Sequence, residues 1–247
     1  MRALGIDLAS QAATTAACIV EWNAGAGRVV AIETGLDDAA LIDRARQATT
    51  TAIDAPFGWP VPFVDFIAGQ HGSVPRPSIQ QWTASWRDEL RFRRTDHQVQ
   101  AILGRWPLSV SSDLIAIVAM RCAGLLDQLG VTDRSGVDSV VEVYPALALA
   151  RWGCRSRGYK GADGAAIRSE LLDEVRRACP ALTIGPNEVD LCRHSDHAFD
   201  ALVASLVARA AFLDLADPIP DKHHAAACTE GWIVLPHADA LARLADQ

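Results

Sequence analysis

The order of the first predicted elements constrains the fold of this chain more than any other feature. Three apolar segments separated by turn residues predict strands over residues 3–9, 14–22 and 28–34. An alanine-rich segment predicts a helix over 39–48, and residues 51–56 form another short apolar strand. Short turns join antiparallel strands, whereas a strand that follows a helical crossover runs parallel to a neighbour. We therefore predict an α/β fold with a mixed five-stranded sheet, in which the first three strands are antiparallel and the later ones parallel.

Two of these strands carry a carboxylate at an unusual place. Asp7 interrupts the first apolar strand, where a buried carboxylate is costly unless it is paired or binds a metal. Asp54 ends the fourth predicted strand just before Ala55 and Pro56, so a simple turn role is the alternative. If the fourth strand pairs with the first, the two carboxylates lie side by side at the carboxyl end of the sheet, where ligands bind in such folds.

Two later elements also carry acids within apolar sequence. Glu142 lies in a predicted strand over 139–144, and Asp196 and Asp200 lie in the first turns of a predicted helix over 196–213. The i, i+4 spacing places the two aspartates on one face of that helix. Because the rest of the helix is apolar, it should pack on the sheet and bring at least one of them towards the strand acids. Alternatively, Glu142 pairs with an arginine, and Asp196 is only a favourable charge at a helix N-terminus.

The whole chain is predicted to form one domain over residues 1–247, with an insertion at about 57–110. The insertion is rich in Trp, Pro and Arg, is irregular apart from a possible helix over 61–70, and should fold over one end of the sheet. Its arginines around 87–94 form either a solvated helix face or a phosphate-contacting patch. The remaining predictions are helices over 111–130, 146–152, 163–179 and 237–245, a turn or short helix from 185, and a strand or extended segment over 229–235.

Composition restricts the classes of function. The net charge of −7 disfavours non-specific binding of nucleic acid. The six cysteines are scattered, so a zinc site of the usual spacing is not expected. No apolar run approaches the ~20 residues of a membrane span, and the N-terminus lacks a secretory pattern, so we expect a cytoplasmic protein with no membrane segment. Clustered Asp and Glu residues instead suit Mg²⁺ or Mn²⁺, the hard divalent ions of phosphoryl transfer.

Seven short motifs in this order resemble those of domain-of-unknown-function family 429. They are residues 5–9 (GIDLA), 53–58 (IDAPFG), 94–96 (RTD), 142–145 (EVYP), 159–160 (YK), 196–202 (DHAFDAL) and 230–233 (EGWI). The resemblance implies an RNase H-like fold and a predicted nuclease activity. The segment from His197 to Ala201 is also similar to the last-helix motif of RuvC-type resolvases, which implies metal binding by Asp7 and Asp200, with Asp196 as a further ligand. Either Asp54 or Glu142 would supply the remaining ligand from a strand end.

Together these features predict a divalent-metal-dependent nuclease or phosphodiesterase. The predicted catalytic residues are Asp7, Asp54, Asp200, Glu142 and Lys160. Arg94, Asp96 and His197 would contact the substrate, a nucleic acid or a nucleotide, although surface positions and ion pairs are the alternative for such residues. Two other functions stay open: a catalytically silent RNase H-like binding module, and an actin-like ATPase or sugar kinase. The last one requires a second RNase H-like half with its own Gly-rich phosphate strand, which the sequence does not contain.

Overall fold

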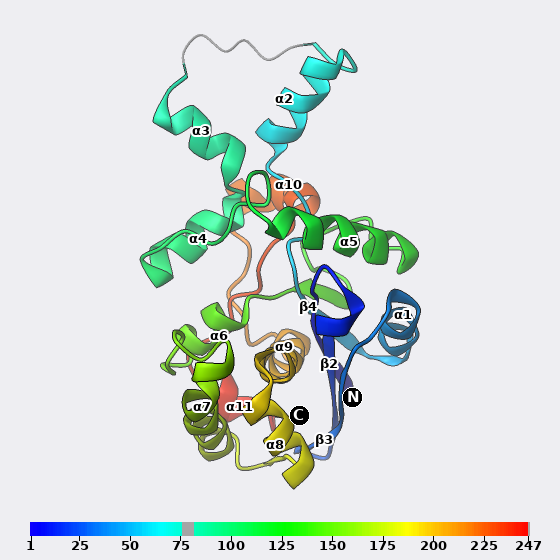
Figure 1. Cartoon of the computed structure of the whole chain (residues 1–247), viewed down its shortest axis with the longest axis vertical. Coiled ribbons are helices and arrows are strands. Elements are labelled where there is room, and N and C mark those ends of the chain that lie inside the picture. The colour runs from blue at the N-terminus through cyan, green and yellow to red at the C-terminus, as the bar shows by residue number, and fades with distance from the viewer. Residues whose placement is uncertain (76–81, 247) are drawn as a thin grey trace.

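A mixed six-stranded sheet forms the centre of the computed structural model, which describes residues 1–75 and 82–246 (Figure 1). Its strands, in the spatial order β5-β4-β1-β2-β3-β6, are β5 (Val140–Glu142), β4 (Thr50–Asp54), β1 (Arg2–Asp7), β2 (Ala16–Asn23), β3 (Ala26–Thr34) and β6 (Leu182–Thr183). The first three strands pair antiparallel, whereas β4 runs parallel to β1, β5 parallel to β4, and β6 parallel to β3. The predicted mixed α/β sheet is therefore confirmed, including the parallel pairing of β4 with β1.

The prediction of five strands is wrong by one. The extra strand, β6, has two residues and adds to the outer edge of β3. It lies between two helices, and two residues are too few to show a strand periodicity. The segment over 229–235 is only in part extended: Thr229 and Glu230 complete helix α10 (Asp221–Glu230), and Ile233 forms one isolated bridge to Glu142.

Helices cover both faces of the sheet, and alternate residues of β1 point to different layers. Leu4 and Ile6 pack with α1 (Asp38–Gln47) and α5 (Ile115–Gln128). The opposite face carries α9 (Asp196–Phe212), which is buried along most of its length. Four further helices complete this face: α6 (Pro145–Arg151), α7 (Ala165–Ala178), α8 (Pro186–His194) and α11 (Ala240–Arg243). The helices predicted in these regions are confirmed, with shifted ends.

Gly5 sets the distance between β1 and α9. A β-carbon at this position would overlap the carbonyl oxygen of Ala201 and the amide nitrogen of Ser205. Only glycine therefore lets the backbone of α9 approach the strand this closely. Asp7 lies two residues after Gly5 and points to the same face, so the approach of α9 brings its own acids towards Asp7.

The insertion is helical, which corrects the prediction of an irregular segment. It contains α2 (Val61–His71), α3 (Ala84–Arg91) and α4 (Arg94–Leu103), while its residues 76–81, including the predicted turn residue Pro77, lie outside the described part. The hydroxyl of Thr83 caps α3 by accepting from the amide of Trp86 at 3.2 Å. In Figure 1, α2 and α3 project away from the sheet, and α4, α5 and α10 lie between them and the strands. None of the described helices is long and apolar enough to cross a membrane.

Candidate functional site

Three carboxylates from three different elements converge at the carboxyl ends of β1 and β4. Asp7 ends β1, Asp54 ends β4 directly beside it, and Asp200 projects from the second turn of α9. One carboxylate oxygen from each lies within 4.8 Å of the others. Asp7 and Asp200 are buried and Asp54 is partly buried. We call these three residues the carboxylate triad.

Burial makes the full negative charge of the triad unfavourable. It raises the pKa of Asp54 well above its usual range, and the neighbouring carboxylates raise it further while Lys160 opposes them. Burial likewise raises the pKa of Asp200 to about 6, against an opposing effect of Lys160. The triad therefore favours either bound protons or a bound cation at neutral pH.

Two basic side chains contact the triad directly. The ammonium group of Lys160 lies 2.6 Å from Asp200, which also accepts a hydrogen bond from the Tyr159 hydroxyl at 2.9 Å. Burial lowers the pKa of Lys160, but the carboxylates of Asp200 and Asp54 outweigh it and the net shift is upward. The Nδ1 atom of His197 lies 2.6 Å from Asp7, and this hydrogen bond raises the pKa of His197.

The loop that carries Tyr159 and Lys160 is held by a buried arginine from α7. The side chain of Arg168 is 1% exposed and donates to the carbonyl oxygens of Tyr159 and Gly161, on either side of Lys160. Its Nε atom donates to the carbonyl of Arg193 at 3.0 Å. Asp196 accepts from the amide of Gly161 at 3.0 Å, so its carboxylate also secures this loop. Both residues therefore fix the position of Lys160 over the triad.

Replacing Arg168 with methionine should release this loop. The change leaves buried carbonyl oxygens without their charged donor, so we expect the free energy of unfolding to fall by roughly 1.5–3 kcal/mol. Limited trypsin digestion of the variant should cut faster after Lys160, and chemical denaturation should report the lost stability. Arg176→Met, at an exposed position of the same helix, is the matched control. Equal digestion of both variants would show that Arg168 does not hold the loop.

Glu142 lies at the end of β5 but its carboxylate is used elsewhere. It pairs with both Nη atoms of Arg93, at 2.9 and 2.8 Å, and accepts from the amide of Phe57 at 3.0 Å. Arg93 pairs also with Asp96 at 3.0 Å. All three charged side chains are at most 3% exposed. Burial raises the pKa of Glu142 even though Arg93 opposes it.

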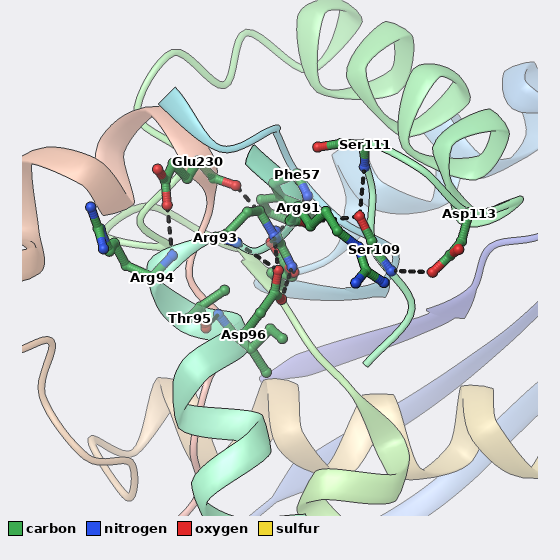
Figure 2. A network of polar contacts seen from close by, with 12 residues as sticks. Phe57, Arg91, Arg93, Arg94, Thr95, Asp96, Ser109, Ser111, Asp113 and Glu230 are labelled. Carbon is green, nitrogen blue, oxygen red and sulfur yellow. Dashed lines mark hydrogen bonds and ion pairs between the residues drawn. The ribbon is translucent and has the colours of Figure 1, made fainter. Parts of the chain in front are cut away.

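Glu230 extends this arrangement to the start of two helices. Its carboxylate accepts from the amides of Val61 and Arg94, at 2.9 and 2.7 Å, which are the first residues of α2 and α4. Figure 2 shows the contact of Glu230 with the Arg94 amide, and the Arg94 side chain points away from Arg93 and Asp96. Arg93, Asp96, Glu142 and Glu230 form what we call the junction network, because it joins the insertion to β5 and to the end of α10.

The predicted site residues thus separate into two groups. Asp7, Asp54, Asp200, Lys160 and His197 come together. Asp96 and Glu142 belong to the junction network, and the exposed Arg94 contributes a backbone amide to it. Sequence reasoning missed Arg93 and Arg168. Arg93 carries one usable signal, since it precedes α4 with Asp96 at the third helical position, where Asp96 accepts from the Arg93 amide at 2.9 Å.

A cavity of about 590 Å³ opens over the triad. Asp7 and Asp54 line its floor, together with Lys160, Asp196 and His197. Its other walls come from the junction network, from Tyr144, and from two loops that carry Arg105 and Arg157. Asp7 and Asp54 of the triad are therefore accessible to a ligand of small-molecule size.

Comparison with known proteins gives one match. Residues 5–225 match the model of a family described as "Protein of unknown function (DUF429)". The matched range includes the carboxylate triad, Lys160 and His197, and it ends before Glu230. The chain matches no curated protein and no solved structure.

Proposed function

The chain belongs to DUF429, a family of proteins of unknown function, and from its site we propose that it is a divalent-metal-dependent phosphodiesterase or nuclease. The observation that carries this proposal is the carboxylate triad. One oxygen of each carboxylate lies within 4.8 Å of the others, and Asp7 and Asp54 line a cavity. The reaction adds water across a phosphodiester, so that one product keeps the phosphate and the other gains a hydroxyl group.

The donor set of the triad fits Mg²⁺ or Mn²⁺. Asp7, Asp54 and Asp200 offer only oxygen atoms, which are the ligands that these hard ions prefer. A bound cation would also relieve the cost that raises the pKa of Asp54 and Asp200. When bound, it would supply Lewis-acid polarisation of the phosphoryl group. Of the two predicted strand-end ligands we propose Asp54, because Glu142 is paired with Arg93.

The basic residues of the site have separate roles in this proposal. Asp7 holds Nδ1 of His197, which leaves Nε2 of the ring to accept or return a proton. The ammonium group of Lys160 can contact the charge that develops on phosphate oxygens. Asp196 positions the Lys160 loop instead of binding the metal, since its carboxylate accepts from the Gly161 amide.

We also propose that the fold is RNase H-like. The resemblance in sequence suggested this fold, and the antiparallel β1, β2 and β3 followed by the parallel β4 and β5 support it. The actin-like alternative would need a second half of the same kind. In the described residues we find one sheet of six strands, which favours the nuclease proposal over a kinase or ATPase.

Asp7→Asn should abolish most of the proposed activity. The substitution keeps the shape of the side chain but removes one charge of the triad, and we expect a loss of about 10²–10³-fold in rate, the scale for one electrostatic group in an active site. Hydrolysis of bis(p-nitrophenyl) phosphate with Mg²⁺ or Mn²⁺ measures this, and EDTA should remove it. Asp190→Asn on the surface of α8 is the matched control. Activity that survives both Asp7→Asn and EDTA would refute the proposal.

A catalytically silent binding module is the second candidate, and one observation favours it. Lys160 and His197 each lie 2.6 Å from a triad carboxylate, so the chain itself offsets part of the negative charge. Such a protein would hold its ligand without needing a metal ion. The response of the melting temperature to metal distinguishes the two candidates.

A further inference from the structure

Two arginines without a carboxylate partner line the same cavity as Asp7 and Asp54. Within residues 1–75 and 82–246, Arg105 makes no ion pair, and Arg157 donates only to the carbonyl oxygen of Leu103, at 3.0 Å. Other arginines of the chain, such as Arg44 and Arg121, pair with carboxylates at 2.6 and 2.7 Å. The guanidinium groups of Arg105 and Arg157 therefore keep their capacity for an anionic ligand, and arginine suits phosphate oxygens in particular.

An aromatic ring lines the same cavity as the arginines and Asp54. Tyr144 lines the cavity and is partly buried, and its hydroxyl has no hydrogen-bond partner among the described residues. Burial raises the pKa of Tyr144, the charge of Arg105 lowers it, and the charge of Asp54 raises it further. The hydroxyl group is therefore close enough to both residues to feel their charges. A ring in this position can stack on a base, an interaction that every nucleobase can make.

The walls limit the size of what can enter. The volume of about 590 Å³ lies within the range of roughly 300–1,000 Å³ that small-molecule sites occupy. The contact between Arg157 and the Leu103 carbonyl joins the loop before Lys160 to the end of α4. A base that enters a cavity of this size must first leave the stack of a duplex, so the cavity favours unpaired nucleotides.

From these features we infer that the cavity binds unpaired nucleotides, with a phosphate held by Arg105 and Arg157 and a base against Tyr144. The substrate class is therefore single-stranded nucleic acid or a short oligonucleotide, not an intact duplex. This inference rests on the proposed function for its chemistry, but the binding that it describes can be measured without catalysis.

Fluorescence anisotropy in EDTA tests the inference with the unmodified chain. A labelled 12-nucleotide single strand should bind at least about tenfold more tightly than the blunt duplex of the same sequence. Arg105→Ala and Arg157→Ala should each weaken binding of the single strand by roughly tenfold or more, as expected for loss of a charge-assisted hydrogen bond. Each should also reduce the salt dependence of binding by about one phosphate contact. A labelled dinucleotide shows whether the cavity alone suffices: equal affinity means that it does, and weaker binding means that the strand extends beyond it.

Arg176→Ala on α7 is the matched control, since Arg176 is exposed and does not line the cavity. Arg155 is unsuitable because its Nε atom donates to the carbonyl of Arg157 at 3.1 Å. Equal binding of duplex and single strand, unchanged affinity in both arginine variants, or no saturable binding would overturn the inference. Hydrolysis of bis(p-nitrophenyl) phosphate stays a separate test of the proposed function, because that diester carries no base and needs no nucleotide site.

Discussion

Replacing Arg93 with methionine should lower the free energy of unfolding by about 3–5 kcal/mol, the usual cost of removing one partner from a buried ion pair. Arg93 is 3% exposed and neutralises two carboxylates, Glu142 and Asp96, that are equally buried. Without it, both acids must either stay charged in an apolar environment or take up protons. Chemical denaturation of the two purified proteins would measure the difference.

Arg94→Met provides the control for this prediction. Arg94 follows Arg93 directly, but its side chain is exposed and points away from the junction network (Figure 2). Its replacement should change stability by no more than about 0.5 kcal/mol, as is usual for surface positions. The double variant Arg93→Met, Glu142→Gln should recover part of the loss because it no longer buries an unpaired charge at position 142. Similar losses for Arg93→Met and Arg94→Met would mean that the network adds nothing to stability.

The sequence predicts one site for the acids that interrupt apolar strands, whereas the structure divides these acids between the carboxylate triad and the junction network. Asp7 and Glu142 give the same sequence signal, a carboxylate inside an apolar strand. Their surroundings differ because Glu142 meets Arg93, which lies 49 positions earlier, whereas Asp7 meets Asp54 and Asp200. The sequence alone does not identify a partner so distant along the chain. It could therefore predict that each of these acids needs a partner or a cation, but not which group of residues the acid joins.

The pairing of Asp7 with Asp54, in contrast, followed from local rules. A strand after a helical crossover runs parallel to an earlier strand, and β4 does pair with β1 in the register that aligns these two acids. The i, i+4 spacing of Asp196 and Asp200 also indicated one shared face. It could not indicate which acid joins the triad, because that depends on the close approach of α9 at Gly5 and on the amide of Gly161.

Of the helices in the insertion, α2 agrees with the possible helix over 61–70, whereas α3 and α4 lie in the segment that was predicted to be irregular. The α2 helix is apolar on most of its surface, so it lacks the polar face that marks an amphipathic helix, and it begins at Val61 next to Pro62. Its first amide is bound by Glu230, 169 positions later. The first amide of α2 is thus bound by a residue that the local sequence does not indicate. In contrast, α3 and α4 have local contacts at their N-termini, from Thr83 and Asp96.

The carboxylate triad predicts an unusual dependence of stability on pH for the protein without metal. The pKa of Asp200 rises from its ordinary value of 3.8 to about 6 in the folded chain. The folded state therefore binds more protons than the unfolded state between these values, and its stability falls as the pH rises through them. A difference of about two pKa units corresponds to roughly 3 kcal/mol. The raised pKa of His197 acts in the same direction, since the stability it contributes is lost as the pH rises through its folded value.

Metal should cancel this loss. Without metal, the free energy of unfolding should decrease from about pH 4 to pH 7, and Asp200→Asn should flatten that decrease while Asp190→Asn leaves it unchanged. Added Mn²⁺ should raise the melting temperature more at pH 7 than at pH 5, because the ion competes with protons for the same oxygens. A free energy of unfolding that decreases with pH, together with a melting temperature that does not respond to millimolar Mn²⁺ or Mg²⁺, would favour the silent binding module. In that case Lys160 and His197 are the cations that neutralise the triad. Equal stability of the metal-free protein at pH 4 and pH 7 would instead mean that the three carboxylates do not share protons at all, and the case for a cation between them would fall with it.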